Sequence, residues 1–171
     1  MTTVLTSAFI TTIDTPVGPL VLAADPDGAL THVLFEGESY PLPTAGARRD
    51  AGPFRDVVSQ LEQYFVGARR DFDLPLAPQG TGFQLAAWWA LREIPYGETR
   101  SYAGQARAIG RPDAVRAVGA ANGRNPISII VPCHRVVGAD GSLTGYGGGL
   151  ERKRWLLEHE RASCQTQLLL G

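Results

Sequence analysis

Cys133 and His134 stand next to each other in the stretch 129–138, IIVPCHRVVG. A cysteine has an ordinary pKa of about 8.5, so only a few per cent of it is thiolate, the nucleophilic form, at neutral pH. Making the thiol mostly ionised requires lowering its pKa by about two units, or about 2.7 kcal/mol. A histidine base that is itself oriented by a carboxylate is the usual means. The pair therefore indicates nucleophilic chemistry, and the alternative is a buried, inert thiol beside a satisfied histidine.

The residues around this pair predict a buried strand. Residues 129–131 and Val136 are β-branched, which favours extended structure. Neighbouring side chains of an extended segment point to opposite sides, so Cys133 and His134 are not expected to touch directly. A bridging water, or a kink imposed by Pro132, would have to connect them.

A carboxylate that could orient the histidine lies in the last predicted helix, residues 150–161. Glu160 falls on the same helical face as Leu156 and Leu157. A carboxylate on an apolar face needs a hydrogen-bonding partner or a raised pKa. The chain has only 3 histidines, and His134 is the attractive partner. The alternative is that Glu160 lies in water at a fraying helix end.

A helix predicted over residues 112–122, with Pro112 in its first turn, has two unlike faces. One face should pack inward and consists of Val115, Val118 and Ala121. The other face is nearly bare of side chains and consists of Arg116, Gly119, Ala120 and Gly123. Because glycine costs a helix about 1 kcal/mol relative to alanine, such a face needs a reason. Close approach to a nucleic acid is one reason, and tight packing against another helix is the alternative.

The distribution of charge favours the nucleic acid. Residues 1–80 carry 5 Arg against 10 acidic residues, whereas residues 81–171 carry 11 Lys and Arg against 7 acidic residues. The net charge of −1 therefore hides a basic C-terminal half, as expected of a half that faces a polyanion. Chance scatter of the arginines is the alternative.

The elements that must position these residues predict an α+β fold. Segments 8–13, 18–24 and 29–37 form a small antiparallel sheet, because β-rich runs alternate with turn signals. A helix fits residues 54–65, with Gly67 ending it. The stretch 71–80 (DFDLPLAPQG) carries two prolines and predicts a linker. We therefore expect an N-terminal α/β domain over residues 1–78 and a second domain over residues 79–171.

The second domain is predicted to be mostly helical. Thr81 and Gln84 have the spacing of a capping box that opens a helix reaching Ile94. Ser101 can cap a short helix over 102–109, and this helix with the next one makes a helix-turn-helix candidate. Many plain pairs of helices share that pattern.

The composition indicates a cellular compartment and argues against membrane, secreted and disulfide-rich proteins. The chain is 44% hydrophobic and 19% charged, as in ordinary globular proteins. No apolar run approaches the roughly 18 residues of a membrane span, and the N-terminus lacks the pattern of a secretory signal. Cys133 and Cys164 are too few for a disulfide framework or a cysteine-based zinc site, so we expect a cytoplasmic protein.

Several motifs, in order, resemble one known family. They are TPVGPL at 15–20, IPYGETRSYAG at 94–104, RAVG at 116–119, NPISIIVPCHRVVG at 125–138 and GYGGGLERKRWLLEHE at 145–160. Together they resemble the O6-alkylguanine-DNA alkyltransferases, over about residues 9–161. The tail SCQTQLLLG, with Cys164, falls outside the resemblance and is expected to lack order.

The resemblance implies a role for each matching residue. Cys133 would take the alkyl group from O6 of guanine irreversibly, and His134, through a water, and Glu160 would draw the proton from its thiol. Asn125 would support the helix-turn-helix and the active-site loop. Arg116 would fill the gap left by an everted nucleotide. Tyr102 would crowd the phosphate and donate a hydrogen bond to guanine N3.

The resemblance also implies a pocket, a DNA-binding face and a partner. The pocket would be formed by Val136, Tyr146, Gly147 and Gly148. The residues facing DNA would be Tyr102, Arg116, Ala117, Gly119, Ala120 and Gly123. The partner would be double-stranded DNA that contains O6-alkylguanine or O4-alkylthymine. The protein would bind it as a monomer, alone or cooperatively along the DNA. No cofactor, metal or membrane would be involved. Gly147 stands where relatives often have serine, so a side-chain hydrogen bond to O6 is not expected.

Two other classes of function compete with this one. A cysteine hydrolase could use Cys133, His134 and Glu160, but it would leave the bare face around Arg116 unexplained. A damage-recognition module without chemistry would bind DNA in the same way, and related modules of that kind have replaced the cysteine.

Overall fold

The computed structural model describes residues 7–38 and 45–170, so the first six residues, on which the expectation about a secretory signal partly rests, lie outside it. Four strands form the N-terminal sheet: β1 (Phe9–Ile13), β2 (Leu20–Ala24), β3 (Leu30–Phe35) and β4 (Arg48–Arg49). Their order is β3-β2-β1-β4. The first three are antiparallel as predicted, but β4 pairs with β1 in parallel, so the sheet is mixed. The turn signals did not reveal β4, because its two exposed arginines carry no apolar alternation.

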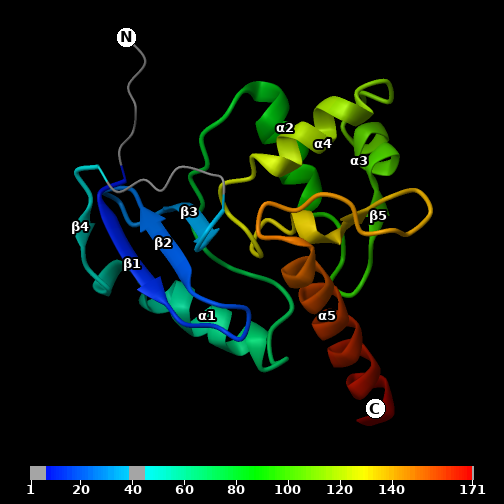
Figure 1. The fold of residues 1–171 in the computed structure, drawn as a ribbon. Helices are drawn as coiled ribbons and strands as arrows, with labels where there is room; N and C mark the ends of the chain where they lie inside the picture. Colours follow the sequence, from blue (N-terminus) through cyan, green and yellow to red (C-terminus); the bar gives the residue numbers. More distant parts are fainter. Residues whose placement is uncertain (1–6, 39–44, 171) are drawn as a thin grey trace.

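One face of the sheet is covered by α1 (Arg55–Phe65), which follows the short 3-10 helix η1 (Gly52–Phe54) (Figure 1). Its apolar side chains recur at helical spacing, and Val57, Leu61 and Tyr64 are buried. Gly67 ends the turn after the helix with φ 79°, a conformation that costs glycine little.

The predicted linker is tied to the sheet rather than loose. Leu30 donates its N–H to the carbonyl of Pro75 (2.9 Å) and accepts from the N–H of Ala77 (2.7 Å). Val33 pairs in the same strand with Ile127 of the C-terminal half. The exposed edge of β3 is therefore occupied by two later segments, and both halves of the chain contribute to one hydrophobic core.

Local signals in the C-terminal half correctly predicted where the first two helices begin. The first ends at Leu91 rather than at the predicted Ile94, because the N–H groups of residues 92–94 bond carbonyls only three residues earlier. In α2 (Gly82–Leu91) both hydrogen bonds of the capping box between Thr81 and Gln84 are present. In α3 (Tyr102–Ala108) the Ser101 side chain accepts from the N–H of Gly104. The third helix was predicted too early: α4 spans Val115–Gly123, because residues 112 and 113 form a turn closed by the N–H of Ala114 and the carbonyl of Arg111.

Two further predictions were wrong. Residues 129–135 do not form a strand: Cys133–Arg135 is a 3-10 helix, η2, and only Val136–Val137 (β6) is extended, paired in parallel with β5 (Arg100–Ser101). The tail is not disordered, because α5 continues from Leu150 to Leu170 and projects from the body of the molecule (Figure 1). Among the described residues, no helix has the length and apolarity needed to cross a membrane.

Candidate active site

The chain turns sharply just before Cys133. Ile129 has φ 71°, which is unusual for a β-branched residue, and the N–H of Val131 returns to the carbonyl of Ile127 (3.1 Å). The β-branched side chains are fully buried here without being in a strand. Their apolar character, rather than their strand preference, accounts for their presence. Strain of this kind persists only where the surrounding structure imposes it.

Asn125 closes this loop. Its Nδ2 donates to the carbonyl of Val131 (2.8 Å), and its Oδ1 accepts from the N–H of Ile127 (3.0 Å). Both bonds are buried, so the amide holds the segment before Cys133 in one shape. This geometry is the one expected of a residue that supports an active-site loop.

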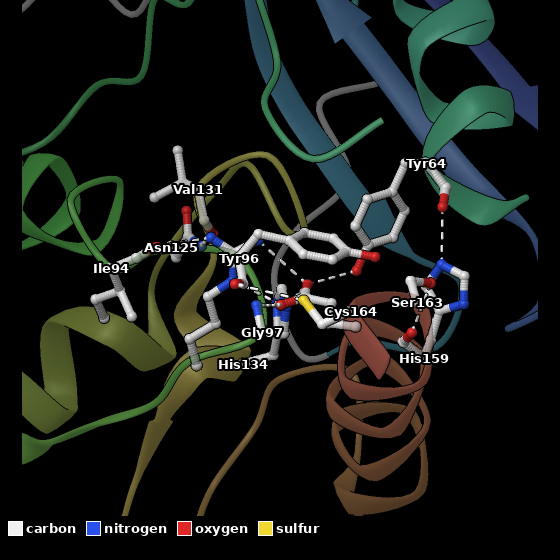
Figure 2. A network of polar contacts seen from close by, with 12 residues as sticks. Tyr64, Ile94, Tyr96, Gly97, Asn125, Val131, His134, His159, Ser163 and Cys164 are labelled. Atoms are coloured by element: carbon white, nitrogen blue, oxygen red, sulfur yellow. Dashed lines mark hydrogen bonds and ion pairs between the residues drawn. The ribbon is translucent and has the colours of Figure 1, made fainter. Parts of the chain in front are cut away.

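η2 directs its three residues differently. Cys133 faces a cavity, while His134 and Arg135 turn toward α5 and bond Glu160. Figure 2 shows His134 within this polar network beside α5. His134 Nε2 lies 2.6 Å from Glu160 Oε2, and Arg135 Nε lies 2.8 Å from Glu160 Oε1. The expected pairing of His134 with Glu160 is therefore present, and Glu160 lies in the core rather than at a fraying end.

Glu160 is the ionised member of this network. Burial alone would raise the pKa of its carboxyl, but the charge of His134 and the hydrogen bonds from His134 and Arg135 outweigh burial, so its pKa lies well below the ordinary value. An ionised carboxylate only accepts, so His134 Nε2 carries the proton of their bond. His134 Nδ1 is buried and has no hydrogen-bond partner among the described residues. In the neutral ring that nitrogen holds the lone pair and can accept a proton.

The Cys133 thiol is neutral at rest. Its side chain is buried, and burial raises its pKa to about 11, while a hydrogen bond from Asn125 lowers it only in part. The carboxylate of Glu38 raises the pKa further, and the ammonium of Lys153 lowers it. In the protein alone the thiol therefore keeps its proton, and His134 lies next to it in the sequence with a ring nitrogen that could accept that proton.

An open cavity of about 370 Å³ has Cys133 in its wall, a size typical of small-molecule sites. Its other lining residues are Tyr102, Gly119, Asn122, Gly123, Thr144, Gly145, Tyr146 and Gly147. Val136 and Gly148, also expected in the pocket, lie behind this wall: Val136 is in β6, and Gly148 packs against the Phe35 ring. The cavity therefore lies between α4 and the loop that precedes α5.

That loop is held from two sides. Tyr102 donates its hydroxyl hydrogen bond to the carbonyl of Thr144 (2.8 Å), and Lys153 Nζ donates to the carbonyls of Thr144 (3.0 Å) and Gly145 (3.3 Å). The hydroxyl of Tyr102, expected to meet guanine N3, is thus engaged within the protein in this state. Burial lowers the pKa of the Lys153 ammonium. The negative charge of Cys133 in its thiolate form would partly offset this lowering.

The small-residue face of α4 borders the cavity. Arg116, Ala117, Ala120 and Gly123 are exposed, and Gly119 is half-buried beside the Tyr102 ring. Val118 and Ala121 pack inward as predicted, whereas Val115 is 36% exposed, because it lies in the first turn of a helix that starts later than expected.

Buried polar pairs fix the orientation of α4. Gln105 of α3 and Asn122 of α4 exchange two side-chain hydrogen bonds of 2.8 Å. Trp88 of α2 donates to the carbonyl of Ala121 (2.8 Å). The alternative of tight packing explains the inner face of α4 but not its outer one, which is open.

Sequence reasoning missed several residues of the site. Arg135 follows the pair directly in a segment predicted to be buried, so the rarity of buried arginine could have marked it. No local signal could have found the others, because they reach the site from distant segments: Tyr64, Glu38, Thr144 and Lys153. Among residues 7–38 and 45–170, no group of three or more His, Cys, Asp or Glu is arranged to hold a metal.

Comparison with known proteins agrees with this geometry. Residues 9–78 match the family model for the ribonuclease-like domain of 6-O-methylguanine DNA methyltransferase, and residues 82–162 match the model for its DNA binding domain. The methylated-DNA–protein-cysteine methyltransferase of Mycobacterium tuberculosis is 52% identical over 159 residues, 93% of this chain and 96% of the relative. That of Methanosarcina acetivorans is 50% identical over 152 residues, 88% and 96% of the two chains.

A solved structure extends the likeness to three dimensions. The crystal structure of Mycobacterium tuberculosis OGT in complex with DNA superposes with a TM-score of 0.86 at 51% identity, over 91% of this chain and 94% of that one. Identity of this level over nearly the whole chain, in sequence and in structure, shows common descent. The chain therefore belongs to the 6-O-methylguanine DNA methyltransferase family.

Proposed function

We propose that this protein repairs DNA by moving the alkyl group of O6-alkylguanine to its own Cys133, once per molecule. The single observation that carries the proposal is the position of Cys133. Its thiol faces an open cavity beside the bare face of α4. One ring nitrogen of the adjacent His134 is bonded to Glu160, and the other has no partner in the described part of the chain. The site thus combines a buried nucleophile, a base and a cavity that can hold a planar nucleobase.

The chemistry follows from these groups. The S–H proton leaves through a bridging water to His134 Nδ1, and the sulfur lone pair attacks the alkyl carbon. The C–O6 bond breaks, its electron pair stays with the guanine, and the imidazolium returns the proton to the base. The products are a thioether on Cys133 and unmodified guanine. No simple step reverses a thioether, so the protein is consumed, and the reaction as written needs no cofactor or metal.

Access requires base flipping. An O6-alkyl group lies inside the base stack, so the base must leave the duplex, at a cost of a few kcal/mol that is smaller for a poorly paired base. The small residues of α4 allow the backbone close to the minor groove, and Arg116 is exposed on that face to fill the vacated position. The same pocket would accept O4-alkylthymine.

The bound base would meet groups that line the cavity. Tyr102 would release the carbonyl of Thr144 and donate its hydroxyl hydrogen bond to guanine N3 instead. This donation would stabilise the negative charge that develops on the leaving base. The carbonyls of Cys133 and Val136 would accept from the exocyclic amine. Tyr146 and Gly147 would form the wall, with Gly148 supporting it against Phe35. At Gly147 a main-chain N–H would serve where relatives often have a serine hydroxyl.

Setting and assembly complete the proposal. Both cysteines are free thiols, as suits the reducing cytoplasm in which the protein would act. We expect a monomer on double-stranded DNA, with a functional division near residues 78 and 79. Cooperative binding along DNA is a separate question for titration at several lengths of duplex.

The test is a mass measurement. The protein is incubated with a duplex that carries O6-methylguanine, digested, and the peptide containing Cys133 is weighed. Methyl transfer predicts a gain of one methyl group on that peptide. A cysteine hydrolase would instead leave the peptide unmodified while turning over many substrates, and a binding module without chemistry would leave both the peptide and the lesion unchanged.

Arg116→Ala separates DNA handling from chemistry. We expect this variant to react with duplex lesions at least about tenfold more slowly, because the vacated base position is no longer filled. Its reaction with a free O6-alkylguanine base should stay within about twofold of the wild type, since no duplex has to be opened. Equal losses on both substrates would exclude the proposed role of Arg116.

A further inference from the structure

Cys133, His134 and Glu160 form the proton relay of the proposed reaction. The carboxylate of Glu160 is also bound by a residue from the N-terminal half of the chain. Tyr64, in α1, donates its hydroxyl hydrogen bond to Glu160 Oε2 at 2.7 Å. The same oxygen receives the bond from His134 Nε2 at 2.6 Å. All three side chains are buried, and 96 residues separate Tyr64 from Glu160 in the sequence. Figure 2 shows this network between Tyr64 and His134.

Tyr64 is held at both ends. Its carbonyl accepts a 2.7 Å hydrogen bond from His159 Nε2, one residue before Glu160 in α5. Its ring packs edge-on against Phe65 (5.3 Å between centroids), Tyr96 (6.1 Å) and His159 (5.3 Å). The hydroxyl is therefore fixed on the carboxylate before any substrate arrives, and ordering it costs nothing during the reaction.

The hydroxyl of Tyr64 keeps its proton at neutral pH and therefore remains a donor. Burial raises the pKa of Tyr64 well above its ordinary value, and the charge of Glu160 and their hydrogen bond raise it further. A phenol that keeps its proton cannot act as a base, but it can share the negative charge of a carboxylate with a second donor.

We propose that Tyr64 is a positioning residue for alkyl transfer, which divides the charge of Glu160 between itself and His134 and so sets how readily the imidazolium releases its proton. The inference rests on the function proposed above. In the reaction, the Cys133 proton goes to His134 Nδ1 and then to the departing guanine. The proton of Tyr64 stays on its own oxygen, and no covalent bond of Tyr64 changes.

The surroundings of the carboxylate define what a hydroxyl deletion would change. The titratable and charged groups around Glu160 and Tyr64 come from four segments: His134 and Arg135 of η2, Tyr96 after α2, Arg70 after α1, and His159 and Cys164 of α5. Of these, His134 and Arg135 bond Glu160 directly. Without the Tyr64 hydroxyl, Oε2 would keep, from residues 7–38 and 45–170, the bond from His134 and a long 3.3 Å bond from Arg135.

The direction of the effect follows. With one donor fewer, more of the carboxylate's charge acts on the imidazolium, which then persists to higher pH. Less of the histidine is available as a base under acidic conditions, while under alkaline conditions it is a base in either case. The acid limb of the rate profile should therefore move to higher pH.

The experiment compares Tyr64→Phe with the wild type in single-turnover methyl transfer from an O6-methylguanine duplex between pH 5.5 and 9. We expect the variant to be about three- to tenfold slower at pH 6 and within about twofold of the wild type at pH 8.5, as the loss of one charge-assisted hydrogen bond allows. In a Glu160→Gln background, Tyr64→Phe should cause no further change in the pH profile of the rate. Tyr64 would act through the Glu160 carboxylate, which that background lacks.

Tyr96→Phe is the matched control. It deletes a hydroxyl from the same aromatic cluster, and among the described residues that hydroxyl has no hydrogen bond to the relay, so its profile should match the wild type. Tyr64→Met, which fills the space without a donor, is used if Tyr64→Phe does not fold. Parallel profiles for Tyr64→Phe and wild type, or a loss that persists in the Glu160→Gln background, would overturn the inference. An unreactive wild type would instead overturn the proposed function.

Discussion

Cys133 has to be shielded and reactive at once. Burial keeps the thiol protonated, which protects it from oxidation and from stray electrophiles, since both attack the thiolate. The proposed reaction therefore depends on a base that acts only when a substrate is in place. We propose His134 as this base, because Glu160 fixes its orientation and leaves Nδ1 for the proton.

The protected thiol has a measurable signature. In protein without DNA, alkylation of Cys133 by iodoacetamide should accelerate about tenfold for each pH unit between pH 7 and 10, because the thiolate fraction rises in this way below a pKa of about 11. The Cys164→Ser variant restricts the label to one site. A rate that levels off near pH 8 would show that the resting thiol ionises far more easily than its burial implies.

Glu160 should matter for stability as well as for chemistry. Glu160→Gln leaves the buried Arg135 guanidinium without its counter-charge, and we expect a loss of about 3 kcal/mol in the free energy of unfolding at pH 7. The pKa of Glu160 is lowered by folding, so its contribution is present above the ordinary carboxyl pKa and is lost as pH falls. The gap between variant and wild type in urea unfolding should therefore narrow steadily below about pH 4; a constant gap would contradict the assignment of the charge.

At the scale of elements, sequence signals predicted helix starts correctly where the structure depends on residues close together in the chain. The capping box of α2 and the Ser101 cap of α3 depend on residues three apart, and both are formed. The segment 129–135 was assigned to a strand because its composition favours one, yet Asn125 and the turn at Ile129 bend it into η2. Its shape is decided by contacts that no local pattern contains.

The outer face of α4 provides a test at this scale. Ala120→Glu puts a carboxylate on the face proposed to approach the phosphates, and binding of duplex DNA should weaken at least about tenfold at low salt. Ala162→Glu makes the same change of charge on an exposed position of α5, away from that face, and should bind within about twofold of the wild type. Fluorescence anisotropy with a labelled duplex measures both. Equal weakening would mean that net charge alone, rather than this face, governs binding.

Across the whole molecule, the N-terminal half supports the pocket that the C-terminal half forms. Arg152 of α5 donates to the carbonyls of Val17 (2.8 Å) and Gly148 (3.2 Å), and its guanidinium lies over the Phe35 ring. These contacts join the β1–β2 turn and the end of β3 to the pocket wall. The pairing of His134 with Glu160 was predicted from the sequence, but these contacts were not, because pairs such as Val17 and Arg152 are 135 residues apart.

Gly148 tests this support. A Cβ at Gly148 would lie 2.6 Å from the Phe35 ring, so Gly148→Ala should shift the pocket wall, cost about 1–3 kcal/mol of stability and slow methyl transfer. Gly147→Ala is the matched control, because a Cβ there would meet only Glu38, at 3.4 Å. Thermal unfolding and single-turnover rates measure the two effects. If the two variants behaved alike, the contact with Phe35 would not be what shapes the wall.

The central claim is that the sulfur of Cys133 accepts one alkyl group and that the protein molecule is then irreversibly inactive. It is tested most directly by titrating a fixed amount of protein with an excess of duplex carrying O6-methylguanine and counting the lesions removed. We predict a plateau of about one lesion per active molecule, with no repair by Cys133→Ser. Continued repair beyond that plateau, or repair by the serine variant, would contradict the claim.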